Sequence, residues 1–130
     1  MIALAKLMMS PKDLDSMVTR KVSGIDHHIQ GVAVNKKTGK AYNVDIELNT
    51  PKMELDSNCK VSCTCEDFKF RWAYVLWQQD ALLHPKTFIL TPPEKTNPNE
   101  TLNACKHIHA FIHNEMIGKL RTMSTKNNQI

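Results

Sequence analysis

Two closely spaced pairs of metal-ligating residues are the strongest chemical signal in this sequence of 130 residues. The first pair is Cys63 and Cys65, and the second, after 39 intervening residues, is Cys105 and His107. In an extended chain, residues i and i+2 point to the same side, so the first pair can bind one ion from a strand end. The second pair can bind it where a loop turns into a helix. Three sulfurs and one imidazole form the ligand set of a closed, tetrahedral structural zinc site, so we expect one zinc ion per chain.

These four residues resemble the SWIM zinc finger, whose pattern is Cys-x-Cys, a spacer and then Cys-x-His. The resemblance implies metal ligation by Cys63, Cys65, Cys105 and His107, with strands before the first pair and a helix after the second. A small stand-alone chain with an aromatic helix after the first pair and an Asn-Pro segment before the second also resembles bacteriophage gene products. The resemblance therefore implies a phage protein that binds other proteins or DNA.

Four cysteines could instead form two disulfides, but the one-residue spacing of Cys63 and Cys65 disfavours that pairing. The apolar N-terminus is interrupted by Lys6, is too short to span a bilayer, and lacks the charged leader and small-residue cleavage site of a signal peptide. We therefore expect a protein of the virion or the host cytoplasm, neither secreted nor transmembrane, in which the cysteines stay reduced.

The sheet is expected to be small and antiparallel, with about three strands. Apolar residues alternate from His28 to Leu48 around a turn at residues 35–40, which predicts a hairpin with one buried face. A third strand, Lys60 to Cys63, is expected beside it and would deliver Cys63 to the metal. The turn-rich residues 49–58 are expected to wrap an edge.

About three helices are expected to pack on this sheet, which makes the predicted fold class α+β with one zinc as a staple. Ser10 followed by Pro11 is a helix start, and a helix to about Val22 would end at Gly24. The other two helices are predicted from Asp67, as the N-cap, to about Asp80, and from about Asn103 to Arg121. The loop at residues 84–103 could contain a short strand at residues 87–90.

This pattern divides the chain into three parts. Residues 1–25 are predicted to be an N-terminal helical segment, residues 26–122 the SWIM-like zinc-binding domain, and residues 123–130 a polar tail. A chain of this length fits one domain, and a zinc ion would add stability to its core.

The helix after the first ligand pair carries five of the eight aromatic residues of the chain. Phe68 and Trp72 belong to one apolar face with Val75 and Leu76, whereas a second face contains Ala73 and three aromatic residues: Phe70, Tyr74 and Trp77. A helix that is apolar on two sides is normally buried on two sides. The second face either packs on the first and last helices or, because Trp and Tyr are common in interfaces, contacts a partner protein.

Other residues suggest less specific chemistry. Cys59 is a spare thiol, and His109 and His113 lie one helical turn apart without a third ligand. A site with four protein ligands leaves no position for an activated water, and no nucleophile arrangement or phosphate-binding loop is visible, so we expect no enzymatic activity.

Two functions follow from these observations. The first is a structural or adaptor protein that contacts other subunits of a larger assembly, such as a virion. The alternative is a DNA-binding zinc finger, for which Lys36, Lys37 and Lys40 at the hairpin tip are the candidate phosphate contacts. The formal charge of +4 changes by −3 + 2 on binding zinc through three thiolates, and the remaining charge of about +3 is too small to argue for nucleic acid by itself.

Overall fold

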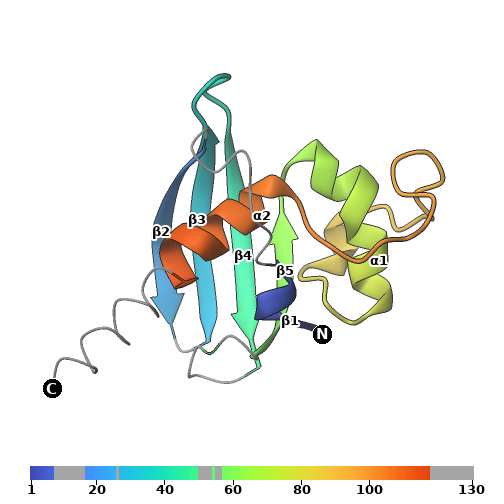
Figure 1. The fold of residues 1–130 in the computed structure, drawn as a ribbon, viewed down its shortest axis with the longest axis horizontal. Coiled ribbons are helices and arrows are strands. Elements are labelled where there is room, and N and C mark those ends of the chain that lie inside the picture. Colours follow the sequence, from blue (N-terminus) through green and yellow to red (C-terminus); the bar gives the residue numbers. More distant parts are fainter. Residues whose placement is uncertain (8–16, 26, 50–53, 55–56, 118–130) are drawn as a thin grey trace, which may run out of the picture.

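The computed structural model describes residues 1–7, 17–25, 27–49, 54 and 57–117. Its sheet has five antiparallel strands in the order β1-β5-β4-β3-β2 (Figure 1). The strands are β1 Ile2–Ala3, β2 Met17–Ile25, β3 His28–Asn35, β4 Ala41–Leu48 and β5 Asn58–Cys63.

Two helices of about 11 residues each accompany this sheet. The first helix begins as a π-helical segment, η3 (Phe68–Trp72), and continues as α1 (Ala73–Gln78). The second helix begins as α2 (Lys106–Phe111) and continues as the π-helical segment η5 (Ile112–Ile117). Two short 3-10 turns, η1 (Leu4–Leu7) and η4 (Pro85–Thr87), complete the described elements.

The predicted hairpin and third strand are confirmed. β3 and β4 pair from His28 opposite Glu47 to Val34 opposite Ala41, and β5 pairs with β4 on its other side. At the tip, the Asn35 carboxamide oxygen accepts the Lys37 N–H at 2.9 Å, and Gly39 adopts φ +72°. Glycine adopts this left-handed conformation without a Cβ clash, which is why the turn forms there.

The predicted fold class is wrong in its number of strands and helices. Met17–Ile25 forms strand β2 and not the end of a helix, because its residues pair with β3 at eight positions around a bulge near Val22. β-branched residues favour such a pleated edge. The start of the predicted helix, at residues 8–16, and the tail at residues 123–130 lie outside the described residues. At the opposite edge, Ile2–Ala3 pairs with β5 and forms a further short strand, which the expected count of about three strands did not include.

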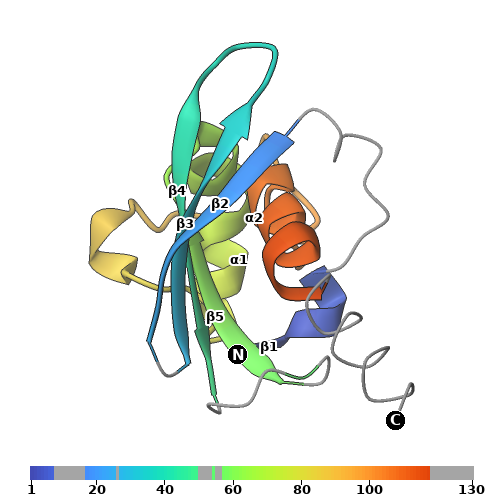
Figure 2. The same ribbon diagram turned by 90° about the vertical axis from the view of Figure 1, so that its left-hand side faces the viewer.

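The second helix covers one face of the sheet (Figures 1 and 2). A Cβ atom added at Gly31 of β3 would lie 2.1 Å from Cε2 of Phe111 and 2.5 Å from the carbonyl oxygen of Arg20. Glycine is therefore required where the Phe111 ring packs directly on the strand. The largest fully buried side chains are Phe68, Phe111, Leu4, Leu7, Ile46, Leu48, Leu76, Ile108, Ile112, Met116 and Val44.

The first helix and the loop that follows it lie beyond the β5 edge (Figure 1). The chain returns to that edge after the helix, where the Val61 N–H donates to Ala81 and the Leu83 N–H donates to Val61, each at 2.9 Å. The bridge is parallel and joins Val61 to Leu82. It lies beside β5, beyond Asn58 and Cys59, the residues of β5 that pair with β1. The short strand considered for residues 87–90 does not form. Thr87 ends η4, and residues 88–90 are irregular.

Candidate metal centre

The first ligand pair is positioned at the end of β5. The Thr64 N–H donates to the Asn43 carbonyl at 3.2 Å, and the Asn43 N–H donates to the Thr64 hydroxyl at 3.0 Å. These two bonds hold Thr64 against β4, while Cys63 and Cys65 on either side of it are both buried. The alternation of an extended chain thus presents both sulfurs to the interior.

The second ligand pair begins the second helix. Cys105 is its N-cap, with extended backbone angles of φ −76° and ψ 164°, and His107 lies in the first turn. Upstream, the Asn103 carboxamide oxygen accepts the Ala104 N–H and lies 2.8 Å from Nε2 of His109. Because that oxygen only accepts, Nε2 of His109 carries a proton and donates to it. These bonds set the turn that brings Cys105 to the first pair.

The four predicted ligands come together in one cluster. Their sulfur and ring-nitrogen atoms all lie within 4.8 Å of one another, and all four residues are buried. In a tetrahedral site with Zn–S bonds of about 2.3 Å and a Zn–N bond of about 2.1 Å, the ligand atoms are about 3.6–3.8 Å apart. The cluster is therefore compatible with a single metal ion after a small contraction. All four cysteines are free thiols, which argues against the alternative of two disulfides.

The imidazole of His107 supports the same conclusion. Both of its ring nitrogens are buried, and neither has a hydrogen-bond partner among the described residues. Such an unpaired polar group is costly unless something else satisfies it. The Tyr42 ring packs beside the imidazole, with ring centroids 4.5 Å apart, and holds it in place without supplying a hydrogen bond. The donor set and this unpaired imidazole fit a metal ion.

Electrostatics at the three sulfurs also favours a bound cation. Hydrogen bonds from the thiols of Cys105 and Cys63 lower the pKa of Cys65 well below its usual range. Burial, followed by the neighbouring Cys63 and Cys65, raises the pKa of Cys105. Three buried thiolates without a cation would repel one another. A divalent cation offsets that repulsion and stabilises all three as ligands.

Cys65 also caps the first helix, which the sequence interpretation assigned to Asp67. Asp67 is already helical, with φ −56° and ψ −42°. The Cys65 sulfur instead accepts the Phe68 N–H at 3.3 Å, and the Cys65 carbonyl accepts the Lys69 N–H at 3.2 Å. A sulfur that accepts an N–H three residues later replaces the oxygen of a Ser or Asp cap. A cysteine three residues before Phe68 was the sequence feature that could have indicated this cap.

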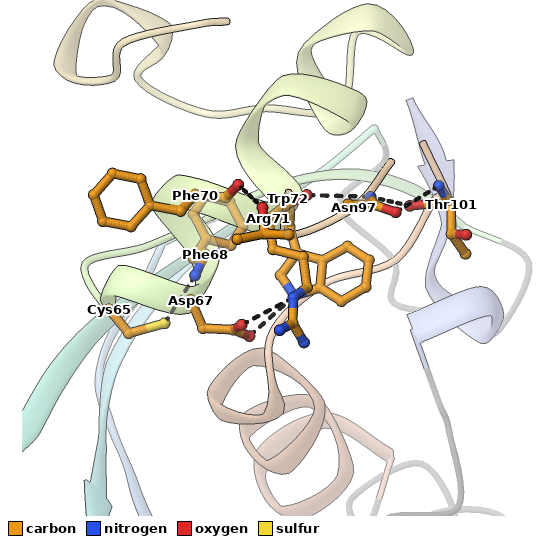
Figure 3. Close-up of polar contacts among 9 residues, drawn as sticks. Cys65, Asp67, Phe68, Phe70, Arg71, Trp72, Asn97 and Thr101 are labelled. Atoms are coloured by element: carbon orange, nitrogen blue, oxygen red, sulfur yellow. Dashed lines mark hydrogen bonds and ion pairs between the residues drawn. The ribbon is translucent and has the colours of Figure 1, made fainter. Parts of the chain in front are cut away.

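Asp67 contributes to the surface of this helix. Its carboxylate accepts the Trp72 indole N–H at 3.1 Å and lies 3.3 Å from Nε of Arg71 (Figure 3). From the loop, the Asn97 side chain donates to the Arg71 carbonyl and to the Thr101 carbonyl, and accepts the Thr101 N–H (Figure 3). The loop is thereby held to the helix by a buried side chain.

The residues of the predicted partner face differ in their exposure. Phe70 is 64% exposed and Trp77 47% exposed, so neither the sheet nor the second helix covers them. Tyr74 and Trp77 contact each other, with ring centroids 5.9 Å apart, whereas Phe70 lines a separate groove with the loop. Ala73, expected on the same face, is fully buried. Packing of this face on other helices, the alternative interpretation, is wrong for Phe70 and Trp77.

The remaining candidates lie apart from the cluster. Cys59 is fully buried, donates its S–H to the Ile2 carbonyl at 3.3 Å, and has its pKa raised by burial to about 12. His109 is buried against Asn103, whereas His113 is exposed. The three lysines at the hairpin tip, Lys36, Lys37 and Lys40, are all exposed.

No protein-family model matches the chain, and comparisons with curated proteins and with solved structures also found no match. Among the described residues, no helix has the length and apolar character needed to cross a lipid bilayer.

Proposed function

We propose that this chain is a non-enzymatic adaptor, stabilised by one structural zinc ion, that contacts other protein subunits in a larger assembly. The observation that carries the proposal is the buried cluster of Cys63, Cys65, Cys105 and His107. Four protein ligands satisfy a tetrahedral zinc ion and leave no position for substrate or water, which is the arrangement of a structural site. When bound, zinc would supply bonds that hold β5, the first helix and the second helix together.

The contact surface in this proposal is the ring pair of Tyr74 and Trp77. Both rings lie on the outer side of the first helix, beside Gln78, whose amide donates to the Tyr74 hydroxyl at 3.0 Å. A half-exposed Trp next to a Tyr supplies a large, rigid apolar area with polar edges, as interface residues commonly do. The resemblance of the ligand spacing and the aromatic helix to bacteriophage SWIM proteins extends the proposal to a component of a bacteriophage virion.

Two measurements on the purified chain test the proposal. Metal analysis should find one zinc per chain, and removal of zinc by a strong chelator should unfold the protein. Trp77→Ala should preserve the folded chain but reduce its recovery in purified particles. Val22→Ala, at an exposed apolar residue on the opposite edge of the sheet, is the control and should leave that recovery unchanged. Full native stability without metal would refute the proposal.

DNA binding is the second candidate function. The observation that favours it is the exposure of Lys36, Lys37 and Lys40 at the end of a projecting hairpin (Figure 1). Phosphate contacts release counterions, so the affinity for duplex DNA would fall steeply with salt and would be lost in a Lys36→Glu/Lys37→Glu variant. If the chain instead associates with protein subunits independently of salt, the result supports the adaptor function.

A further inference from the structure

An open apolar groove lies between the first helix and the loop that follows η4. It has a volume of about 470 Å³, within the range of sites that hold small molecules or short peptide segments. We call it the Phe70 groove, and its lining residues include Phe70 on the helix and Phe88, Ile89, Pro92 and Pro93 on the loop. Phe70 is 64% exposed and Ile89 is 86% exposed, so two large apolar side chains face solvent on opposite walls. Side chains of this kind, gathered at one concave site, indicate a binding surface.

The charge of the groove has one sign. Among the described residues, the charged side chains that line it are Lys69 and Lys95, one on each wall, and no carboxylate lines it. Both lysines are exposed, and neither forms an ion pair with a carboxylate of the described residues. Two other cations on or near the first helix are paired. Arg71 lies beside Asp67, and Lys60 lies 3.2 Å from Asp80. The unpaired lysines favour a ligand that carries negative charge on both sides of an apolar group.

The groove is already formed without a ligand. The Thr96 hydroxyl donates to the Phe70 carbonyl, and Asn97 donates to the Arg71 carbonyl at 3.2 Å, so the loop wall is fixed to the helix wall. Beneath them, the Phe68 and Phe88 rings pack with centroids 5.5 Å apart. A preformed site loses little conformational entropy on binding.

Two of the three threonine hydroxyls that line the groove already donate hydrogen bonds within the chain. The Thr87 hydroxyl donates to the His84 carbonyl at 2.8 Å, and the Thr96 hydroxyl is bound to Phe70 as described. Recognition must therefore rest on apolar contact within the groove and on the two lysines at its walls. This combination suits a protein segment better than a polar small molecule, which needs several fixed hydrogen-bonding groups.

We propose that the Phe70 groove binds an extended segment of a partner protein, with one bulky apolar side chain inserted between Phe70 and Ile89 and flanking carboxylates on Lys69 and Lys95. The proposal rests on the adaptor function, because both require a protein partner. It names a different surface from the Tyr74–Trp77 pair, and it specifies the chemistry of the segment bound there.

The test uses the full-length zinc-loaded chain and three labelled nonapeptides, followed by fluorescence anisotropy at low salt. One peptide has a central Phe flanked by Asp residues, the second has Lys in place of Asp, and the third has Ala in place of Phe. The first should bind about tenfold or more tightly than either of the others. Ile89→Ser, at an exposed residue that folding does not require, should reduce that affinity about tenfold.

Charge reversal provides the sharper comparison. Lys69→Glu/Lys95→Glu should lose the Asp-flanked peptide and gain the Lys-flanked one. Lys36→Glu/Lys37→Glu, which has the same net charge but changes the hairpin tip, should bind like the original chain. Circular dichroism and zinc content verify that each variant is folded.

Three results would overturn the proposal. They are equal affinity for the Asp and Lys peptides, equal loss of affinity in the two double variants, and no peptide binding at all. Salt-dependent DNA binding that requires Lys69 and Lys95, without peptide binding, would assign the groove to nucleic acid and also overturn it. A folded, zinc-containing chain that still associates with particles through Trp77 would leave the adaptor proposal intact after any of these results.

Discussion

The two helices start in the same way and are stabilised differently. Each begins at a cysteine of the metal cluster, Cys65 for the first helix and Cys105 for the second. The Cys65 sulfur accepts an N–H of the first helix, whereas the Cys105 side chain accepts none from the second. Beyond that first turn, the second helix is buried continuously from His107 to Ile112, whereas the first exposes Phe70 and Trp77.

The difference arises from what each helix packs against. The second helix lies across one face of the sheet (Figure 2). Its Phe111 ring packs directly on Gly31. The first helix lies beyond the edge of the sheet and is covered by a loop that its own residues hold in place (Figure 3). The second helix is thus stabilised mainly by burial, and the first depends more on its cap and on loop hydrogen bonds. The comparison teaches that one candidate metal centre can join a helix packed on the sheet to a helix whose aromatic side chains stay exposed.

Removing a metal ligand should affect both helices and have the largest effect. Structural zinc contributes on the order of 10 kcal/mol, comparable to the whole stability of a domain of this size. Cys63→Ser and Cys105→Ser should therefore unfold the chain, as should chelation. Thermal unfolding followed by circular dichroism, together with zinc analysis, checks this result.

Cys59→Ser is the matched control, because its hydroxyl can still donate to the Ile2 carbonyl. It should keep the zinc and lose no more than about 1 kcal/mol of unfolding free energy.

Lowering the pH should have the same effect as removing a metal ligand. Burial raises the pKa of Cys105, so protons compete with the metal there, and zinc should be released progressively as the pH falls. Zinc retention that is independent of pH would contradict this assignment.

Gly31→Ala should selectively disrupt the packing of the second helix. The added Cβ would meet the Phe111 ring and the Arg20 carbonyl at distances that require backbone movement. Overpacking of this kind costs about 2–3 kcal/mol. Gly24→Ala is the control, since its Cβ would meet only the flexible end of the Lys21 side chain. Chemical denaturation should place Gly24→Ala within about 0.5 kcal/mol of the original chain.

Asn97→Ala should selectively loosen the first helix and its loop. The change removes three hydrogen bonds of a buried side chain and leaves the Thr101 N–H without its acceptor. We expect a loss of about 2 kcal/mol, because the groups left behind are partly buried. Hydrogen exchange should accelerate in residues 68–102 and stay slow in the second helix. Asn99→Ala, at an exposed position of the same loop, should change neither; uniform acceleration across both helices would contradict the comparison.

Asp67→Asn should have the smallest effect. The amide oxygen can still accept the Trp72 indole N–H, so only the exposed ion pair with Arg71 is lost. Such pairs are worth about 0.5 kcal/mol and are screened by salt. The difference in unfolding free energy should therefore vanish at high ionic strength. A larger loss that persists in salt would contradict the conclusion that Asp67 contributes only an exposed ion pair.

The local pattern of the sequence was sufficient for the central hairpin and for the metal ligands. Alternating apolar residues from His28 to Leu48 specify a half-buried strand pair, because a strand has a period of two. Ligand chemistry similarly singles out Cys63, Cys65, Cys105 and His107, and the structure brings them together. That the metal is zinc, and that the chain is an adaptor, remain predictions.

Tertiary structure decided the rest of the fold. Met17 and Val18 fitted one side of the helix that was predicted to run to about Val22, but pairing with β3 makes Met17–Ile25 an edge strand. The partner is the next strand along the chain, with Ile25 opposite His28 and Met17 opposite Asn35. This pairing overrides the local helix signals, because helix propensity and capping patterns are weak compared with tertiary context. Likewise, the sequence showed that the first helix is apolar on two sides. Only packing determined that Ala73 is buried while Phe70 and Trp77 remain exposed, because burial depends on which other elements reach each side of a helix.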